Sequence, residues 1–518
     1  MGISGKLTWA AAIVIAGVLG ATPSWAGKKD DTLNVIVARD VLTLDNMYAT
    51  RRENHILTRN YDDMLFYLHP QTGEVIPLLV ESYKVEGSTA DLVLKKGIKF
   101  HDGSELTAED VAYSINFQSS KKSKAYRQKY LGRWIKKAVV TGPYSVRINM
   151  KHAYPLVAYD LAAYSRIRKK GTYDDPSKED GINRDAARSK LIGLGPYKIK
   201  EYVPMKRIVL ERFEDYRKDS PKGFPSIKRI TLRTVPDYGV QAAEIMAGNA
   251  DMAFYIPHDI AADVQKSGRA KHVLGYSMRI GFIVLDAAGA TGKDAPTTKL
   301  KVRQALNHAF DRESLVKTLI KGTGEVIHSA CNPVQFGCAV NVKKYEYDPE
   351  KAKKLLAEAG YPNGFSTTLW AYREKYVAEA LVGMLKKVGI KAKLRYLKGS
   401  QLRKAEKNNE VMMTFRTHGS TSVPHVGKLV PLFFGGGDSR NDRYISHDKE
   451  VVNLVRKATS THDENAQKEF FEKALQRVAE QAYWVPLYKF SLNYLLSNDL
   501  EFDPPKDGMP RLFLAKWK

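Results

Sequence analysis

Two side chains that could bind a ligand lie at the end of a predicted strand in the second half of the chain. Residues 367–372 have the composition of a strand, and Trp370 and Arg373 come at its end and just beyond it. An aromatic ring beside a guanidinium group can stack on a ligand and pair with its carboxylate. Core packing is the alternative for Trp370, and the sequence leaves both open.

The carboxylates Asp45 and Glu53 are the candidates for catalysis, as the acid and base of a secreted hydrolase. Carboxylates this close in sequence are also common on protein surfaces. The chain has no phosphate-binding loop, nucleophile elbow or zinc-protease motif, and its 12 histidines are scattered. We therefore predict a protein that is not an enzyme and that holds no metal or cofactor.

The N-terminus has the pattern of a secretory signal peptide. Lys6 supplies a positive charge, residues 7–19 are apolar, and small residues precede a cleavage site at Ala26. The apolar run is too short for a transmembrane helix, which needs about 20 residues. We predict that residues 1–26 are removed and that the mature protein is exported to the periplasm of a Gram-negative bacterium.

The chain has 2 cysteines, Cys331 and Cys338, which bracket one turn-rich segment. In an exported protein this spacing favours a disulfide that closes the segment, with free thiols as the alternative.

The formal net charge of +25 is the unusual part of the composition, since 43% hydrophobic and 27% charged residues are ordinary for a globular chain of 518 residues. Such a charge is typical of proteins with anionic partners, or of a well-solvated surface. A secreted polyanion-binding protein is thus one hypothesis. No nucleic-acid-binding motif accompanies the charge, so we predict no nucleic-acid partner.

Residues 91–117 contain the most informative local pattern. Short apolar runs at 92–94 and 98–100 predict two strands, and His101 and Asp102 begin a polar turn. Thr107 with Asp110 predicts a capped helix. The stretch resembles the signature of the bacterial solute-binding proteins of the oligopeptide, dipeptide and nickel type, extracellular solute-binding protein family 5. Residues 301–320, KVRQALNHAFDRESLVKTLI, resemble a second motif of that family, and 347–360 a third.

The resemblance implies an α/β fold of the periplasmic-binding-protein type II kind, with two lobes of mixed sheets joined by a hinge, plus an accessory domain. We predict lobe I at 27–71, 195–288 and 485–518, the accessory domain at 72–194, and lobe II at 289–484. It also implies a monomeric substrate-binding component of an ABC importer. Such a protein captures a peptide-like solute by hinge closure and delivers it to the membrane permease.

Four further candidate ligand contacts are implied by the resemblance. The family's loop beside the ligand cleft matches residues 42–48, which makes Tyr48 and Arg51, together with its neighbour Arg52, candidate contacts. Tyr488 follows the strand that leads back to the first lobe, and core packing is its alternative.

One departure from the family pattern concerns the ligand itself. Peptide binders of the family have a cleft tryptophan and an aspartate that pairs with the peptide amine, and here the tryptophan is missing and Ser420 aligns with the aspartate. Serine supplies no charge for an ammonium group. Arg416 and His418 lie nearby instead, which favours an anionic solute such as an opine-like compound or a sugar acid. Transport of a metal chelate is the third hypothesis within the family.

Overall fold

The computed structural model describes residues 27–49, 51–321, 324–419, 422–436 and 448–518. The predicted signal peptide and Ser420 lie outside these ranges. Within them, no helix has the length and apolar character needed to cross a membrane.

A mixed sheet extends through both halves of the molecule, and among the described residues it has 11 strands. Along the sheet the strands lie in the order β15 (Lys391–Tyr396), β14 (Ser366–Ala371), β16 (Met413–His418), β12 (Ala270–Leu285), β17 (Trp484–Ser497), β11 (Met252–Phe254), β1 (Thr32–Val37), β10 (Arg229–Thr234), β9 (Arg207–Arg212) and β8 (Tyr197–Val203), and β13 (Gly324–Val326) also pairs with β17.

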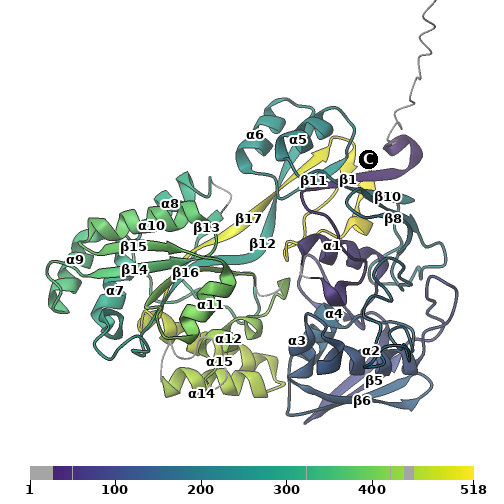
Figure 1. Ribbon diagram of the computed structural model, residues 1–518, viewed down its shortest axis with the longest axis horizontal. Helices are drawn as coiled ribbons and strands as arrows, with labels where there is room; N and C mark the ends of the chain where they lie inside the picture. Colours follow the sequence, from purple (N-terminus) through teal and green to yellow (C-terminus); the bar gives the residue numbers. More distant parts are fainter. Residues whose placement is uncertain (1–26, 50, 322–323, 420–421, 437–447) are drawn as a thin grey trace, which may run out of the picture.

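Strands β12 and β17 connect the two halves (Figure 1). They are the longest strands described, with 16 and 14 residues, and they pair with each other in antiparallel register along most of their length. One half of each belongs to the sheet of each lobe. The pairing is irregular between Tyr276 and Ile280, so the ladder is interrupted where the chain passes from one lobe to the other. A bulge of this kind bends and twists a strand pair.

We call the half with β11, β1, β10, β9 and β8 lobe I. At its centre the sheet is buried on both faces, as the uniformly buried β1 shows. Helices α5 (Tyr238–Met246) and α6 (His258–Lys266) cover one face, and α1 (Arg52–Tyr61) packs into the core on the other.

Lobe II contains β13, β14, β15 and β16 and is also a three-layer structure. Helices α7 (Leu300–Ala309), α8 (Arg312–Thr318), α9 (Pro349–Glu358) and α10 (Lys375–Lys387) share one core with the sheet. Helices α11 (Gly399–Lys407), α12 (Val430–Phe434), α14 (Lys449–Ser460) and α15 (Glu464–Glu480) share the core on the opposite face. Helix α9 begins as the sequence predicts, because Asp348 accepts a hydrogen bond from the backbone of Lys351 and Pro349 occupies the first helical position.

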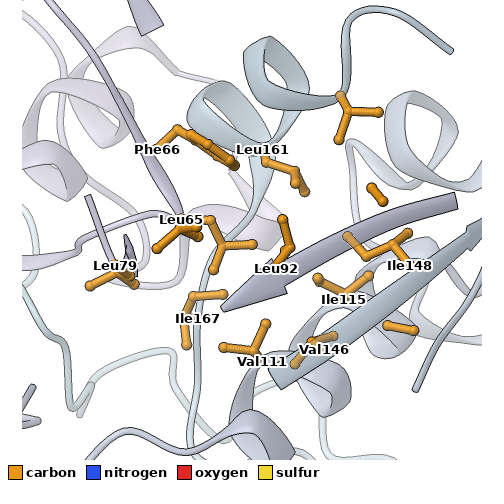
Figure 2. Close-up of a cluster of buried hydrophobic side chains, with 14 of the residues drawn as sticks. Leu65, Phe66, Leu79, Leu92, Val111, Ile115, Val146, Ile148, Leu161 and Ile167 are labelled. Atoms are coloured by element: carbon orange, nitrogen blue, oxygen red, sulfur yellow. The ribbon is translucent and has the colours of Figure 1, made fainter. Parts of the chain in front are cut away.

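The accessory domain has its own four-stranded sheet, and its core is built by apolar side chains that point toward one another from strands and helices (Figure 2). The strands lie in the order β4 (Val80–Glu86), β5 (Thr89–Leu94), β7 (Ser145–Met150) and β6 (Ile135–Gly142). Helices α2 (Ala108–Ser119), α3 (Gln128–Gly132) and α4 (Val157–Tyr164) pack on it, and a small hairpin of β2 (Phe66–Leu68) and β3 (Val75–Pro77) lies beside them.

The signature segment is structural. Thr107 and Asp110 form the predicted capping box at the start of α2. The predicted strand at 98–100 is wrong: this segment forms only an isolated bridge from Lys99 to Glu105, because the chain folds back at once through the turn that joins Phe100 N to Ser104 O. The ring of His101 contacts the backbone of residues 193–195, with 2.9 Å from Nε2 to Gly195 O, and so ties this turn to the segment that returns to lobe I.

Cys331 and Cys338 form the predicted disulfide, with Cα atoms 5.7 Å apart. The loop that they close lies against residues 422–429 of lobe II, which we call the docking loop. Phe336 donates its backbone N–H to Pro424 O and accepts from Val426 N, so the closed loop supports the docking loop by main-chain hydrogen bonds.

The docking loop joins lobe II to the accessory domain. Val423 belongs to the accessory core, whereas Val426, three residues later, belongs to the core of lobe II. Gly427 passes so close to the accessory domain that a Cβ there would lie 2.8 Å from Leu156 Cδ1. The two halves of the molecule are thus in contact at a point far along the chain from the crossing strands.

Candidate ligand site between the lobes

The carboxyl ends of β14 and β16 lie side by side, because these two strands pair in parallel. Ligands of open α/β sheets bind at such carboxyl ends. Tyr372 follows β14 and donates its hydroxyl to Thr417 O, at 3.3 Å, near the end of β16. Two residues further, Glu374 has a left-handed backbone with φ of 41°, a strained conformation for a residue with a side chain. It precedes α10 without capping it by a side-chain hydrogen bond.

Arg279 reaches the same place from the crossing strand β12. Its Nη1 donates to Thr417 Oγ1 at 2.9 Å. The pKa of Arg279 is lowered to about 10, mainly by burial, and the positive charges of Arg373 and Arg52 contribute to the shift. Arginines are thus gathered around a half-buried position where each disfavours the charge of the next.

Arg52, whose charge acts on Arg279, lies in the first turn of α1 in lobe I. The guanidinium carbon of Arg52 lies 3.8 Å from the centre of the Tyr255 ring, which follows β11. Glu53, the next residue of α1, is buried, and its Oε2 has no hydrogen-bond partner among the described residues.

Tyr488 completes the group from strand β17. It lies opposite Gly281 in the register, and its ring fills the space that the glycine leaves, since a Cβ there would be 2.7 Å from Tyr488 Cζ. The side chain is fully buried, and its oxygen has no hydrogen-bond partner in the described part of the chain. Burial raises the pKa of Tyr488, and the charge of Glu374 adds to the increase.

We call Arg52, Glu53, Arg279, Arg373, Glu374 and Tyr488 the hinge cluster. It combines side chains from lobe I, lobe II and the strands between them. Its three guanidinium groups exceed its two carboxylates by one charge. Burial raises the pKa of Glu374, while Arg279 and Arg373 oppose the increase, and its Oε2 has no hydrogen-bond partner among the described residues. A set of charged groups left partly unsatisfied between two lobes is suited to bind a polar, net negative solute.

The hinge cluster contains three of the predicted contacts, Arg52, Arg373 and Tyr488. The other predicted residues of lobe II lie elsewhere. Trp370 is 4% exposed and packs into the core shared with α11 and α12, with the guanidinium of Arg395 4.4 Å above its ring. Arg416 forms a buried ion pair with Glu406 of α11. His418 lies edge-on to Phe433 of α12, at 5.8 Å between ring centres. Strand alternation explains this, because Thr417 points to one face and its two neighbours to the other.

On the lobe I side, Tyr48 donates its hydroxyl to Ser123 O at 3.0 Å, and Arg51 donates to Asp40 O at 3.0 Å. Both side chains support loops by these hydrogen bonds. Asp45 is fully buried, pairs with Arg168 at 3.6 Å and accepts from Tyr173 at 2.7 Å. That carboxylate therefore has a structural role. Ligand contact by Tyr48, Arg51, Trp370, Arg416, His418 and Ser420 stays a prediction.

The sequence interpretation missed Arg279, Glu374 and Thr417. Glu374 directly follows the predicted contact Arg373, so its place after a strand was a usable signal. For Arg279 the sequence contains no such signal, because the residues around it in the sequence do not show that β12 crosses between the lobes. Among the described residues no group of three or more histidine, cysteine, aspartate or glutamate side chains is placed to hold a metal ion.

Two lobes built on one pair of crossing strands, with a polar cluster between them, define a type II binding protein for small solutes. The comparisons agree. Residues 74–440 match the family model of bacterial extracellular solute-binding proteins, family 5, middle region, and the chain belongs to this family. It is therefore the substrate-binding component of an ABC importer and not an enzyme.

Among sequence relatives, the glutathione-binding protein GsiB of Salmonella paratyphi A is 27% identical over 499 residues, which cover 92% of each chain. Among solved structures, HbpA2 from Haemophilus parasuis has a TM-score of 0.84 at 21% identity, covering 94% of this chain and 100% of that one. The peptide-bound DppA from Helicobacter pylori has a TM-score of 0.76 at 21% identity, covering 95% and 99%.

Proposed function

We propose that this protein is the periplasmic receptor for a small peptide-like solute that carries two carboxylates and one ammonium group, of the kind represented by glutathione. The observation that carries the proposal is the charge of the hinge cluster, in which three arginines face two carboxylates. Such a cluster matches a ligand with a net charge of −1, since unlike charges attract and the excess positive charge is then neutralised.

The arginine pattern supports a dicarboxylate in particular. Arg52 lies on lobe I, Arg373 on lobe II and Arg279 on the strand between them. Guanidinium groups bind carboxylates by paired, charge-assisted hydrogen bonds. A ligand with carboxylates at both ends can therefore contact both lobes at once, and contacts made only when the lobes are close favour the closed form that the permease recognises.

The family relatives support the same solute class, because several of them are named as glutathione-binding proteins. At neutral pH glutathione carries two carboxylates and one ammonium group. We further propose that the protein acts as a monomer in the periplasm of a Gram-negative bacterium, after cleavage at Ala26, with the domain ranges predicted from the sequence.

Isothermal titration calorimetry on mature protein, unfolded and refolded to remove bound solute, tests the solute class. The panel holds glutathione, glutathione amidated at its glycine carboxylate, trialanine, an opine and nickel–histidine. We expect glutathione to bind, and the amide to bind about tenfold more weakly or worse, since each lost charge-assisted hydrogen bond costs about 1.5 to 3 kcal/mol. Binding of trialanine, the opine or nickel–histidine without glutathione would contradict the proposal.

A further inference from the structure

We infer that Glu374 and Tyr488 form the subsite for the ligand's ammonium group, within the hinge cluster and beside the arginines that bind its carboxylates. The inference rests on the proposed function, and it names the two groups that bind the ammonium group of the solute.

Glu374 has an oxygen that needs a donor. Its carboxyl group lies at the carboxyl end of β14, and Oε2 is buried without a hydrogen-bond partner among the described residues. An ionised carboxylate can only accept hydrogen bonds, and leaving a buried acceptor unsatisfied costs about 1 to 3 kcal/mol, more for a charged group. A ligand donor placed here would remove that cost.

Tyr488, on strand β17, has a second oxygen without a hydrogen-bond partner among the described residues. Its ring is fixed between β12 and β17 by the close approach to Gly281, so the hydroxyl has little freedom to seek another partner. The titratable and charged groups that act on this hydroxyl are Glu374, Tyr376 and Arg279. In the strand register Gly281 lies between Tyr488 and Thr417, and the side chain of Thr417 hydrogen-bonds to Glu374. The phenol and the Glu374 carboxylate are thus connected through Gly281 and Thr417.

An ammonium group fits both oxygens. It carries three donors and no acceptor, so it can donate to the carboxylate and to the phenol oxygen together. A ligand carboxylate would be repelled by Glu374 and would leave its Oε2 without a donor. The surrounding Arg279 and Arg373 then have carboxylates as their natural partners, which gives the ligand a direction in the site.

The strained backbone of Glu374 is consistent with a binding role. A non-glycine residue with φ of 41° is held there by its surroundings, and such positions cluster at ligand sites. The residue also has no cap hydrogen bond to α10 that would explain its side chain as a helix terminator.

The test compares glutathione with N-acetylglutathione, which keeps both carboxylates but has no ammonium group. Calorimetry is done on the full mature protein and on Glu374→Gln, Tyr488→Phe and the control Glu379→Gln, whose carboxylate pairs with Lys375 on the exposed side of α10. We expect wild type and the control to prefer glutathione at least tenfold. Glu374→Gln should bind glutathione about thirtyfold more weakly and N-acetylglutathione within twofold of wild type, and Tyr488→Phe should lose about fivefold for glutathione alone.

Equal weakening for both compounds in Glu374→Gln, or no change for either, would overturn the subsite while leaving the proposed function intact. Failure of wild type to bind either compound would overturn the proposed solute class and the subsite with it. Melting temperatures of the unliganded variants check folding, and Tyr488→Phe keeps the ring that packs on Gly281, so the subsite can still be judged if Glu374→Gln is unstable.

Discussion

Lys428 of the docking loop and Arg279 of the hinge cluster are both cations buried where lobe II meets the rest of the protein. Lys428 pairs with Asp160 of α4, and the other oxygen of that carboxylate accepts from Trp134 at 3.0 Å and from Tyr154 at 2.8 Å. Arg279 instead lies near two more arginines and near Glu374, whose Oε2 has no hydrogen-bond partner in the described part of the chain.

The difference distinguishes a contact that holds the molecule together from one that binds a ligand in the function proposed above. In the docking loop every charge has its partner within the chain, so nothing is gained by adding another molecule. In the hinge cluster the charges do not balance, and among the described residues Glu53, Glu374 and Tyr488 each have an acceptor without a partner, so a solute with the complementary groups would be stabilised there. Four measurements would break or sharpen this comparison.

The largest expected effect is on the docking loop. Lys428→Met removes the partner of the buried Asp160 and should lower the free energy of unfolding by about 3 to 5 kcal/mol, because the carboxylate is then buried without a cation. Denaturant unfolding followed by fluorescence measures it. Lys170→Met is the control, since Lys170 and Glu109 form an exposed pair at 3.0 Å whose loss should cost less than about 1 kcal/mol. Equal losses in the two variants would contradict the assignment.

The disulfide supports the docking loop from lobe II. Replacing both cysteines with serine opens a loop of sequence separation 7 and should cost about 2 to 3 kcal/mol in the chain-entropy description. Thermal unfolding with and without dithiothreitol measures this. The reductant should lower the melting temperature of wild type and leave that of the double variant unchanged. If the melting temperature of wild type does not change, the disulfide does not support the docking loop.

The hinge cluster should respond in binding instead of stability. Arg279→Gln should weaken glutathione binding by about thirtyfold, or about 2 kcal/mol, because a charge-assisted contact to a carboxylate is lost. Its stability should change little, since a desolvated positive charge is removed at the same time. Arg395→Gln, an exposed arginine over Trp370, is the matched control and should bind as wild type does. The comparison fails if Arg279→Gln unfolds the protein without affecting affinity.

The smallest expected effect depends on pH. Burial lowers the pKa of His425 to about 3, with Gln467 opposing the shift and Lys428 adding to it. The folded state keeps His425 neutral while the unfolded chain binds a proton near pH 6.5, so its stabilisation is complete above 6.5 and is lost as pH falls from there toward 3. At pH 5.5 the loss is about 1 kcal/mol. In His425→Gln the free energy of unfolding should depend less on pH between 7 and 5.5 than in wild type. If the two proteins show the same pH dependence, His425 does not cause the loss.

Local sequence predicted several elements because short-range interactions decide them. Thr107 with Asp110, and Asp348 with Pro349, satisfy the first free N–H groups of a helix from within the same few residues, and both helices begin where this chemistry places them. The prediction of a strand at 98–100 was wrong because the turn that follows allows this segment only an isolated bridge. Of the hinge cluster, the sequence predicted Arg52, Arg373 and Tyr488 as candidate contacts, but it did not predict Arg279 or Glu374.

By itself the sequence determined the family, the α/β class, the disulfide spacing and the positive charge that suits an anionic solute, since all of these are set by residue type and local order. Only the tertiary structure decided which charges remain unsatisfied. Arg416 and Arg279 look alike in the sequence, yet strand alternation and packing give the first a buried partner in Glu406 and place the second among other arginines. That balance depends on contacts between distant segments, which residue spacing does not encode.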